Sequence, residues 1–460
     1  MTETASQQQL HTLRTYFQSG ITRSYAFRRQ QLQNLAKEIR TREKEIMDAL
    51  FTDLKKSPEE SYGTEIGLVL SEISTTLKNL RSWMRPRSVS TNLVNLPSSS
   101  RIYRDPLGVA LVIAPWNYPF MLSLVPLAGA IAAGNCVVLK PSELAPATAA
   151  ILEKILHVLF PPEYVRVIQG EGTEVVPALM QSFRFDHIFF TGSVPVGRSI
   201  YQAAAADLVP VTLELGGKSP AIVEKDADLR TAARRIVLGK FTNAGQTCIA
   251  PDYLLVHAEI KDHFIQLLQE TIRNFYGEDP EQSYDYGKII HEKRFDKLIS
   301  YLSQGKILFG GRYDRSKLYL SPTLLEDTGT DQPLMKEEIF GPLLPVLTYR
   351  TMEEALAIIQ LNPNPLAAYL FTRDAALQQA WMERLPFGGG CINNANWHFT
   401  NPHLPFGGIG RSGIGACHGK YTFDLFTHDK AVMKTPVFID PSIKYPPFKG
   451  KLKWFKLFIR

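Results

Sequence analysis

The run Val109-Ala-Leu-Val-Ile-Ala114 decides the fold of this chain. It is apolar throughout and is bounded by Gly108 and Pro115, a pattern typical of a strand that is buried on both faces. A helical segment at Met121–Ala133 and a second apolar run at residues 136–139 follow it. Because two parallel strands need a crossover connection, usually a helix, this order predicts a parallel sheet.

The alternation of strands and helices extends this sheet toward residue 215. Further strands are predicted at 165–168, 187–190 and 211–215, with intervening helices at 146–160, 174–181 and 196–205. The fold class is therefore α/β, with a doubly wound, Rossmann-like sheet that binds ligands at the carboxyl ends of its strands. A strand at 219–223 and a helix at 226–240 begin a second alternating set, which predicts a second α/β domain.

Residues 6–84, before the sheet, are expected to be helical. Apolar residues between Leu32 and Leu54 recur at spacings of three, four and seven with charged residues between them, as in an amphipathic helix. Residues 66–84 repeat this pattern, whereas Arg85–Ser100 is rich in Pro, Ser and Asn and suits a hairpin or a crossover.

The composition is that of a globular protein, and the charge of its main body does not predict nucleic-acid binding. Hydrophobic residues make up 45% and charged residues 21% of the 460 positions, enough for two or three domains. The net charge of +6 comes from residues 431–460, where seven basic side chains stand against Asp440 alone. The rest of the chain is balanced, so only the tail is basic.

The cysteines form no disulfide framework. They are Cys136, Cys248, Cys391 and Cys417, and none stands in a CxxC pair. Such usage is typical of a reducing compartment, so a cytoplasmic location is expected. The first residues lack the basic start and apolar run of a signal peptide, no stretch of about 18 apolar residues occurs, and no metal-ligand cluster predicts a metal.

Cys248 lies in the stretch Phe241-Thr-Asn-Ala-Gly-Gln-Thr-Cys-Ile-Ala-Pro251. Asn243, Gly245 and Pro251 disfavour a helix there, which predicts a turn or loop that can aim a thiol. The thiol is either a buried small hydrophobe, the commoner state of a free cysteine, or a nucleophile. Neighbouring motifs have to decide between the two.

Two polar residues at strand ends are candidates for catalysis. Glu214 stands between leucines in Val211–Leu215, where a carboxylate tends to have a raised pKa and can serve as a base near neutral pH. Its alternative is an edge-strand glutamate that faces water. Asn117 follows the first strand of the sheet and can donate to a developing oxyanion, or it can simply cap a turn between prolines.

Two motifs at strand ends suit a dinucleotide. Gly192-Ser193 follows a strand and opens a helix, as a phosphate-binding turn does, although its spacing to Gly197 is not GxGxxG. An ordinary turn with a helix cap would look similar. Lys140 and Glu143, at the end of another strand, can both reach a ribose or a phosphate, or can belong to a solvated loop.

Two later stretches allow close contact with a ligand. Glu338 and Phe340 precede a Gly-Pro break, and an acid beside an aromatic ring can hold a ribose and a flat ring, or can merely end a helix. The stretch Leu404–Gly415 places five glycines between residues 407 and 415, which lets its backbone approach a ligand or another backbone closely.

Together these segments resemble the aldehyde dehydrogenase family over nearly the whole chain. Seven motifs occur in the family's order, at residues 114–120, 134–143, 189–197, 214–220, 243–251, 337–342 and 404–415. A finer resemblance to the class 3 and fatty aldehyde dehydrogenase branch lies at residues 108–120, 240–253, 398–400 and 417–420. It implies an enzyme that oxidises medium- or long-chain aliphatic, or aromatic, aldehydes to acids with NAD.

The resemblance implies a role for each candidate residue. Cys248 attacks the aldehyde carbon as a thiolate, and the Asn117 side chain with the Cys248 backbone N–H holds the oxyanion. Hydride then passes to the nicotinamide, and Glu214 activates the water that hydrolyses the thioester. The cofactor residues are Lys140 and Glu143 at the adenosine ribose, Gly192 and Ser193 at the pyrophosphate, and Glu338 and Phe340 at the nicotinamide ribose and ring.

The substrate and the second cofactor stay open in this interpretation. Asn394 stands where the branch often has Asp, and Trp397 nearby can reshape the substrate tunnel. Glu143 favours NAD, but this branch is similar to enzymes that accept both cofactors, so NADP is not excluded. The alternatives are a CoA-acylating or semialdehyde-specific dehydrogenase on the same fold and a non-catalytic nucleotide-binding protein; the first does not need Glu214.

The resemblance also divides the chain. Residues 1–84 and 103–212 are expected to form the NAD(P)-binding domain, 213–425 the catalytic domain, and 85–102 with 426–436 an oligomerisation element that makes a homodimer. Residues 437–460 form a basic, aromatic tail. We expect it either to attach weakly to an anionic membrane surface through a short interfacial helix or to pack on the partner subunit.

Overall fold

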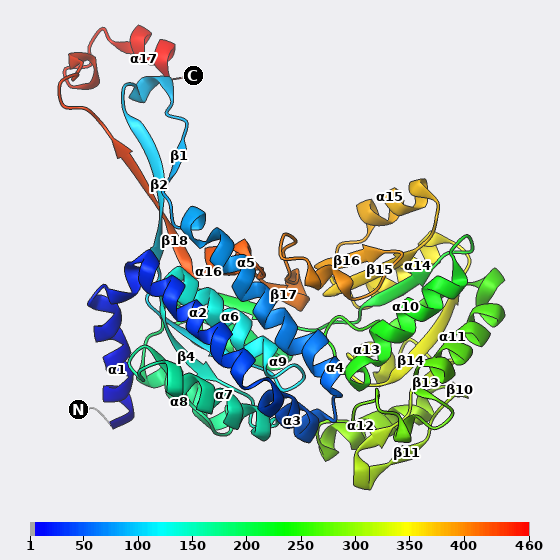
Figure 1. Ribbon diagram of the computed structural model, residues 1–460. Helices are drawn as coiled ribbons and strands as arrows, with labels where there is room; N and C mark the ends of the chain where they lie inside the picture. The colour runs from blue at the N-terminus through cyan, green and yellow to red at the C-terminus, as the bar shows by residue number, and fades with distance from the viewer. Residues whose placement is uncertain (1–4, 460) are drawn as a thin grey trace.

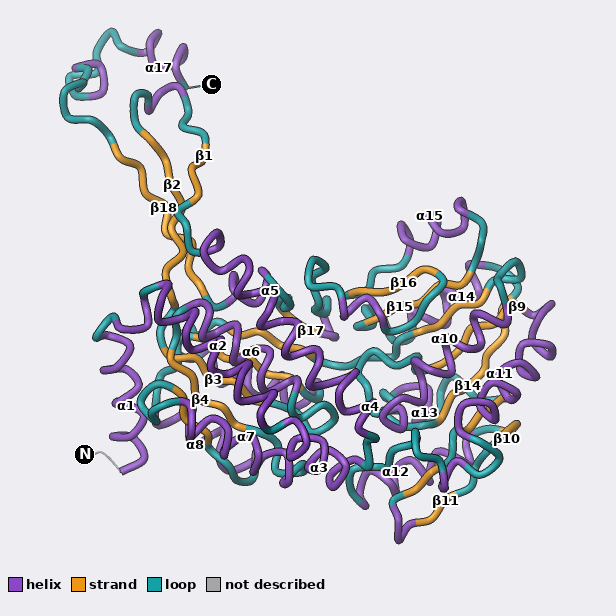
Figure 2. Tube along the Cα trace, in the orientation of Figure 1, coloured by secondary structure: helices purple, strands orange, loops and turns teal. Residues whose placement is uncertain are grey.

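The computed structural model describes residues 5–459 and consists of two α/β bodies and a projecting arm (Figure 1). Residues 1–4, part of the start that lacks a signal-peptide pattern, and Arg460, one of the seven basic residues of the tail, lie outside the described residues. The arm extends away from both bodies and carries the C-terminal segment at its tip (Figure 2). Each body contains one large sheet with its own hydrophobic core.

The first body begins with helices that pack on its sheet. They are α1 (Ala5–Gln18), α2 (Tyr25–Thr41), α3 (Glu43–Leu54), α4 (Pro58–Ser61), the π-helix η2 (Tyr62–Ile66) and α5 (Gly67–Trp83). The expectation of one amphipathic helix between Leu32 and Leu54 is wrong at Arg42, which separates α2 from α3 with φ −104° and ψ 17°. Because the break is one residue long, both apolar stripes still face the core.

The first sheet confirms the predicted parallel order. Its strands run β17-β7-β6-β3-β4-β5, and all neighbours are parallel except β17 and β7. The strands are β3 (Val109–Ile113), β4 (Cys136–Lys140), β5 (Val165–Val167), β6 (His187–Thr191), β7 (Val211–Glu214) and β17 (Gly413–Ile414). The helices between them are α6 (Met121–Ala133), α7 (Pro146–Leu159), α8 (Gly172–Ser182) and α9 (Val194–Ala205).

The second body repeats this architecture around a seven-stranded sheet of order β10-β13-β14-β9-β8-β15-β16. Its strands are β8 (Pro220–Val223), β9 (Tyr253–His257), β10 (Lys306–Phe309), β13 (Thr323–Glu326), β14 (Leu343–Tyr349), β15 (Ala367–Phe371) and β16 (Gly389–Ile392), with a small β11 (Tyr313–Asp314) and β12 (Tyr319–Leu320) pair outside it. Its helices are α10 (Leu229–Phe241), α11 (Lys261–Tyr276), α12 (Glu292–Tyr301), α13 (Pro333–Lys336), α14 (Met352–Gln360) and α15 (Ala375–Arg384). The second α/β body is therefore confirmed.

The arm joins two segments that are far apart in sequence. Strands β1 (Arg87–Val89), β2 (Ser99–Pro106) and β18 (Thr427–Lys434) form an antiparallel sheet in that order, preceded by α16 (Lys420–Leu425). The expected hairpin after residue 85 and the expected late strand are both present. The tail ends in α17 (Leu452–Phe458), and among residues 5–459 no helix is long and apolar enough to cross a membrane.

Candidate active site

The loop that presents Cys248 is an irregular turn after α10. Three successive residues, Asn243, Ala244 and Gly245, have positive φ angles of 54°, 50° and 75°. Two of them are not glycine, so the left-handed backbone is strained and must be held by its surroundings. The predicted loop is therefore confirmed, and its strain lies within five residues of the thiol.

Hydrogen bonds from several elements hold this loop. The backbone N–H of Asn243 donates to Glu60 Oε1 at 2.9 Å, and its side-chain amide donates to the Asn117 carbonyl at 2.8 Å. Gln246 Nε2 donates to the Lys288 carbonyl at 2.9 Å. The sequence gives no sign of these partners, since each lies at least 42 positions away from the residue to which it is hydrogen-bonded.

Cys248 and Glu214 line the same cavity, which has a volume of about 230 Å³. Burial raises the pKa of the Cys248 thiol well above its usual range, and the carboxyl groups of Glu338 and Glu214 add to the shift. The thiol is therefore protonated at neutral pH in this arrangement. A nucleophilic role needs a group that takes its proton.

Glu214 ends β7, and its carboxylate is almost completely buried. The alternative of an edge-strand glutamate facing water is wrong, because β17 pairs with the outer side of β7 and places Gly413 opposite Glu214. Neither carboxylate oxygen accepts a conventional hydrogen bond from the described residues, and burial raises its pKa, partly opposed by the Cys417 thiol. Such a group takes up a proton readily near neutral pH.

Asn117 is buried against the Cys248 loop and is not among the residues that line the cavity. Its side-chain Nδ2 donates to the Gln246 carbonyl at 3.0 Å, which uses one of the two amide hydrogens. The next residue, Tyr118, lines the cavity, and its hydroxyl shares a hydrogen bond with Thr247 Oγ1 at 2.6 Å. Asn117 and Tyr118, in the loop between β3 and α6, are thus joined to the two residues before Cys248.

The two ribose candidates at β4 lie together. Lys140 is buried at the carboxyl end of the strand, and its ammonium forms an ion pair with the Glu143 carboxylate. The other oxygen of Glu143 accepts the backbone N–H of Gly172 at 3.1 Å. This pair lies at the edge of a parallel sheet where ligands bind, and it presents both an acceptor and a donor.

The turn Gly192-Ser193 precedes α9, as expected. Ser193 is the N-cap residue, but its side chain makes no capping hydrogen bond. A Cβ at Gly192 would collide with the Phe190 ring in its present position, so a larger residue there would displace that ring. The helix N-terminus therefore keeps backbone donors and a free hydroxyl for an anion.

Glu338 and Phe340 lie close to the Cys248 loop. Burial raises the pKa of Glu338 to about 8, and its Oε1 has no partner among the described residues. Phe340 has a positive φ of 48° and packs edge-on against Trp116, with ring centroids 5.2 Å apart. Arg294 donates to the backbone carbonyls of residues 338–340 and so fixes this turn.

The cavity wall is mainly apolar and comes from both bodies. It includes Met121, Leu122, Val125, Phe189, Leu238, Ile249, Trp397, Phe399 and Phe406. Trp397 lines the cavity while 55% of its surface is exposed, which puts it at the outer part of the wall. Gly63 and Thr64 of the π-helix η2 also contribute, although no sequence motif marked that segment.

The comparisons with known proteins agree over almost the full chain. The model of the aldehyde dehydrogenase family matches residues 13–432. The chain is 46% identical over 456 residues to the 4,4'-diaponeurosporen-aldehyde dehydrogenase of Staphylococcus aureus, covering 99% of each. It is 45% identical over 453 residues to aldehyde dehydrogenase family 3 member H1 of Arabidopsis thaliana, covering 97% of this chain and 93% of that one. A solved structure, the substrate-bound state of Staphylococcus aureus AldH, superposes with a TM-score of 0.97 at 45% identity, covering 99% and 100%.

Proposed function

The chain belongs to the aldehyde dehydrogenase family, and from that premise we propose which of its residues carry out the reaction. The reaction is the oxidation of an aldehyde to a carboxylic acid with NAD or NADP as the hydride acceptor. The observation that carries the proposal is that Cys248 and Glu214 line one largely apolar cavity. Residues 1–84 and 103–212 would bind the cofactor, and residues 213–425 would hold the catalytic groups.

Cys248 is the nucleophile. Its sulfur forms a bond to the aldehyde carbon once its proton is lost, and the carbonyl oxygen becomes an oxyanion. The second amide hydrogen of Asn117, the one not given to Gln246, and the Cys248 backbone N–H donate to that oxygen. Glu214 lines the same cavity and supplies a buried carboxylate as the general base of the reaction.

Glu214 acts as this base in the second half of the reaction. After oxidation the acyl group is held as a thioester on Cys248, and water must attack its carbonyl carbon. The buried carboxylate takes a proton from that water, the C–S bond breaks, and the acid leaves. A CoA-acylating enzyme would not require this step, so the presence of Glu214 supports hydrolysis.

The described residues fit a dinucleotide at three places. Lys140 and Glu143 offer a donor and an acceptor for the adenosine ribose, and Ser193 with the start of α9 offers backbone donors for the pyrophosphate. Glu338 has an unpartnered oxygen for the nicotinamide ribose, beside the Phe340 ring. When bound, the nicotinamide accepts the hydride that leaves the substrate carbon.

The cavity supports an apolar substrate of medium or long chain, or an aromatic one. Its lining is dominated by aliphatic and aromatic side chains, and the half-exposed Trp397 belongs to this lining. A polar aldehyde would lose hydrogen bonds to water there without replacement. The relative at 46% identity is named for its action on 4,4'-diaponeurosporen-aldehyde, so its name also gives an aldehyde as the substrate.

A panel of aldehydes tests this proposal. NADH absorbance is followed with aliphatic aldehydes of increasing chain length, an aromatic aldehyde and a short polar one, each with wild type and with Cys248→Ala. We expect turnover to rise with chain length and to vanish in Cys248→Ala. Turnover that is unchanged in the variant, or absent with every aldehyde, would refute the assignment.

The arm is the proposed oligomerisation element and makes a homodimer. Strand β18 lies at the edge of the β1-β2-β18 sheet, and seven of its eight residues are exposed. A long exposed edge strand readily pairs with another chain. The four cysteines of the described chain are all free thiols. They fit the proposed reducing, cytoplasmic location.

The tail is proposed to contact an anionic membrane weakly. Helix α17 exposes Leu452 and Leu457 beside Lys453 and Lys456, a mixture that suits the interface of an anionic bilayer. Attachment there would bring the enzyme to apolar aldehydes dissolved in lipid. The alternative is that the tail packs on the partner subunit.

Liposome co-sedimentation decides between the two. Vesicles with and without anionic lipid are mixed with the full chain and with a truncation after Pro447. We expect the full chain alone to pellet, and only with the anionic vesicles. Equal pelleting of the two proteins would support packing on the partner subunit.

A further inference from the structure

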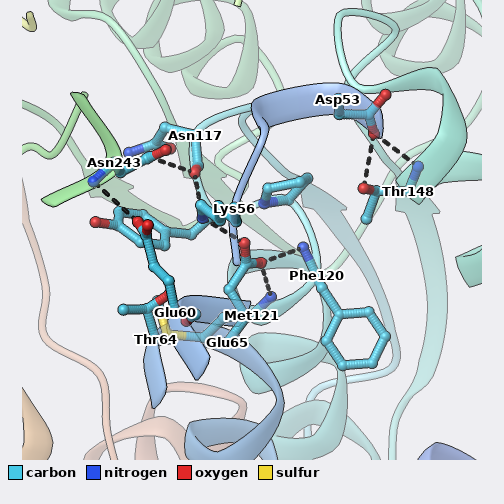
Figure 3. Close-up of polar contacts among 12 residues, drawn as sticks. Asp53, Lys56, Glu60, Thr64, Glu65, Asn117, Phe120, Met121, Thr148 and Asn243 are labelled. Atoms are coloured by element: carbon cyan, nitrogen blue, oxygen red, sulfur yellow. Dashed lines mark hydrogen bonds and ion pairs between the residues drawn. The ribbon is translucent and has the colours of Figure 1, made fainter. Parts of the chain in front are cut away.

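A buried ion pair lies under the active-site loops without belonging to any predicted motif. Lys56 Nζ is 2.5 Å from Glu65 Oε1, and both side chains are 0% exposed (Figure 3). Lys56 precedes α4, and Glu65 lies within the π-helix η2, an uncommon kind of element that is often found near functional sites. Burying two charges is unfavourable in itself, so their other contacts show what the pair can do.

Glu65 holds the start of helix α6. Its second oxygen, Oε2, accepts the backbone N–H of Phe120 at 2.8 Å and of Met121 at 3.1 Å. A carboxylate at a helix N-terminus satisfies donors that have no partner within the helix. The carboxylate therefore fixes the first turn of α6, whose residues Met121, Leu122 and Val125 line the cavity.

Lys56 holds the residues that follow β3. Its ammonium donates to the Asn117 carbonyl at 3.1 Å, and that same oxygen accepts the Asn243 side-chain amide at 2.8 Å. The ammonium also lies 4.0 Å from the centroid of the Tyr118 ring. The backbone of Asn117 is thus clamped between the N-terminal segment and the Cys248 loop, as Figure 3 shows.

These contacts determine where the Asn117 side chain points. One hydrogen of its amide goes to the Gln246 carbonyl, so the other has a single remaining direction. A rotation of the Asn117 peptide would move that hydrogen away from an oxyanion on the Cys248 adduct. Oxyanion donors are effective only when they are held in place before the reaction.

We propose that Lys56, supported by Glu65, is a positioning residue for the oxidation: it fixes the Asn117 peptide so that the side-chain amide meets the oxyanion formed at Cys248. The inference rests on the oxyanion role given to Asn117 under the proposed function. Lys56 touches neither substrate nor sulfur and acts through Asn117 and Tyr118. A buried ion pair that only stabilises the fold is replaceable by two apolar side chains, whereas a positioning pair is not.

The central variant is therefore the double substitution Lys56→Met with Glu65→Leu, which removes both charges and keeps similar volumes. Two reactions of Cys248 are compared in it, with NAD binding measured beside them. Aldehyde oxidation passes through an oxyanion. Alkylation by iodoacetamide does not, because sulfur displaces iodide from a saturated carbon, and it is followed by mass spectrometry of the peptide containing Cys248.

We expect kcat/KM for the aldehyde to fall about 10-fold or more, toward the loss of about 10²–10³-fold expected for Asn117→Ala. The alkylation rate and the Kd for NAD should stay within about 2-fold of wild type, as for a side reaction that needs no oxyanion donor. Arg28→Met is the matched control. Arg28 is a buried cation that donates to the Ala132 carbonyl at the other end of α6. That change should lower the thermal midpoint without this selective loss.

Each other outcome has a distinct meaning. An unchanged kcat/KM in the double variant overturns the positioning role. An equal fall in the rates of oxidation and alkylation also overturns it, because it shows that the structure of the whole Cys248 loop is disturbed. If Asn117→Ala itself is as active as wild type, the oxyanion assignment fails first and the role of Lys56 with it. If the double variant does not fold, Glu65→Gln is used instead, because it keeps the side-chain volume. The same ratio of the oxidation rate to the alkylation rate is then measured in it.

Discussion

Glu214 is almost completely buried, and its two carboxylate oxygens accept no conventional hydrogen bond from residues 5–459; this decides how the rate should depend on pH. Burial raises its pKa well above the usual value of a glutamate. A protonated carboxyl cannot accept a proton, so activity is lost as the pH falls through this raised pKa and is recovered above it. We expect the profile of kcat against pH to have an acidic limb well above pH 4.5.

This limb is measured with a saturating aldehyde and NAD across the pH range. In Cys417→Ala the thiol that partly opposes the shift is absent, so the limb should move to higher pH. Cys417→Ser keeps a donor and serves as the control. A limb that stays in place in both variants would show that another group controls it.

Removing the base should separate the two halves of the reaction. In Glu214→Gln we expect steady-state turnover to fall by about 10²-fold or more, the usual contribution of a positioned general base. If thiol activation survives, a first turnover of NADH remains and the thioester accumulates. Rapid mixing measures the burst, and the intact mass gains one acyl group. Loss of the burst as well would assign the first proton transfer to Glu214 too.

At the scale of elements, the turn of residues 243–245 meets the turn after Phe340. Gly245 has a φ of 75°, and a Cβ there would collide with the Gly341 carbonyl. Gly245→Ala should therefore lower stability by more than the roughly 1–2 kcal/mol of left-handed strain, and it should reduce turnover by displacing Cys248. Gly277→Ala is the control, since its φ is 79° but no atom lies within 4 Å. Thermal midpoints that fall equally in both would contradict the collision.

The same elements show how far the sequence could predict the site. The strands around Val109–Ile113 were predictable because parallel strands buried on both faces read as continuous apolar runs. The roles of Cys248 and Glu214 came from a resemblance, and their shared cavity agrees with it. By contrast, the shielding of Glu214 by β17 depends on a pairing across 199 positions, and nothing in the local pattern of either segment encodes it.

Lys56 illustrates the same limit for charged residues. Its sequence neighbours are polar, and a lysine near a helix end is usually solvated. Its complete burial results from contacts with Glu65 and Asn117, the latter 61 positions away. A single sequence contains no signal for such a pair. Only the folded chain shows that Lys56 is among its few enclosed lysines.

At the scale of the whole molecule, the arm exposes apolar side chains that the rest of the chain does not cover. Its apolar side chains gather on strands and turns that have no partner layer, and several are largely exposed. They include Leu93, Leu96, Val432, Met433, Val437, Phe438 and Ile439. A monomeric protein rarely exposes an apolar surface of this extent.

We expect a second copy of the chain to cover this surface, and two residues in the turn after β18 test it. Val437 is 97% and Phe438 is 81% exposed, so replacing both with Asp should not disturb the fold of one chain. Two buried carboxylates at an interface would instead oppose association strongly. Light scattering after gel filtration should give twice the chain mass for wild type and the single chain mass for the double variant. Leu208→Asp, on a residue 86% exposed in the turn after α9, should leave the dimer intact. A wild type that is already monomeric, or a double variant that remains dimeric, would remove the arm from the interface.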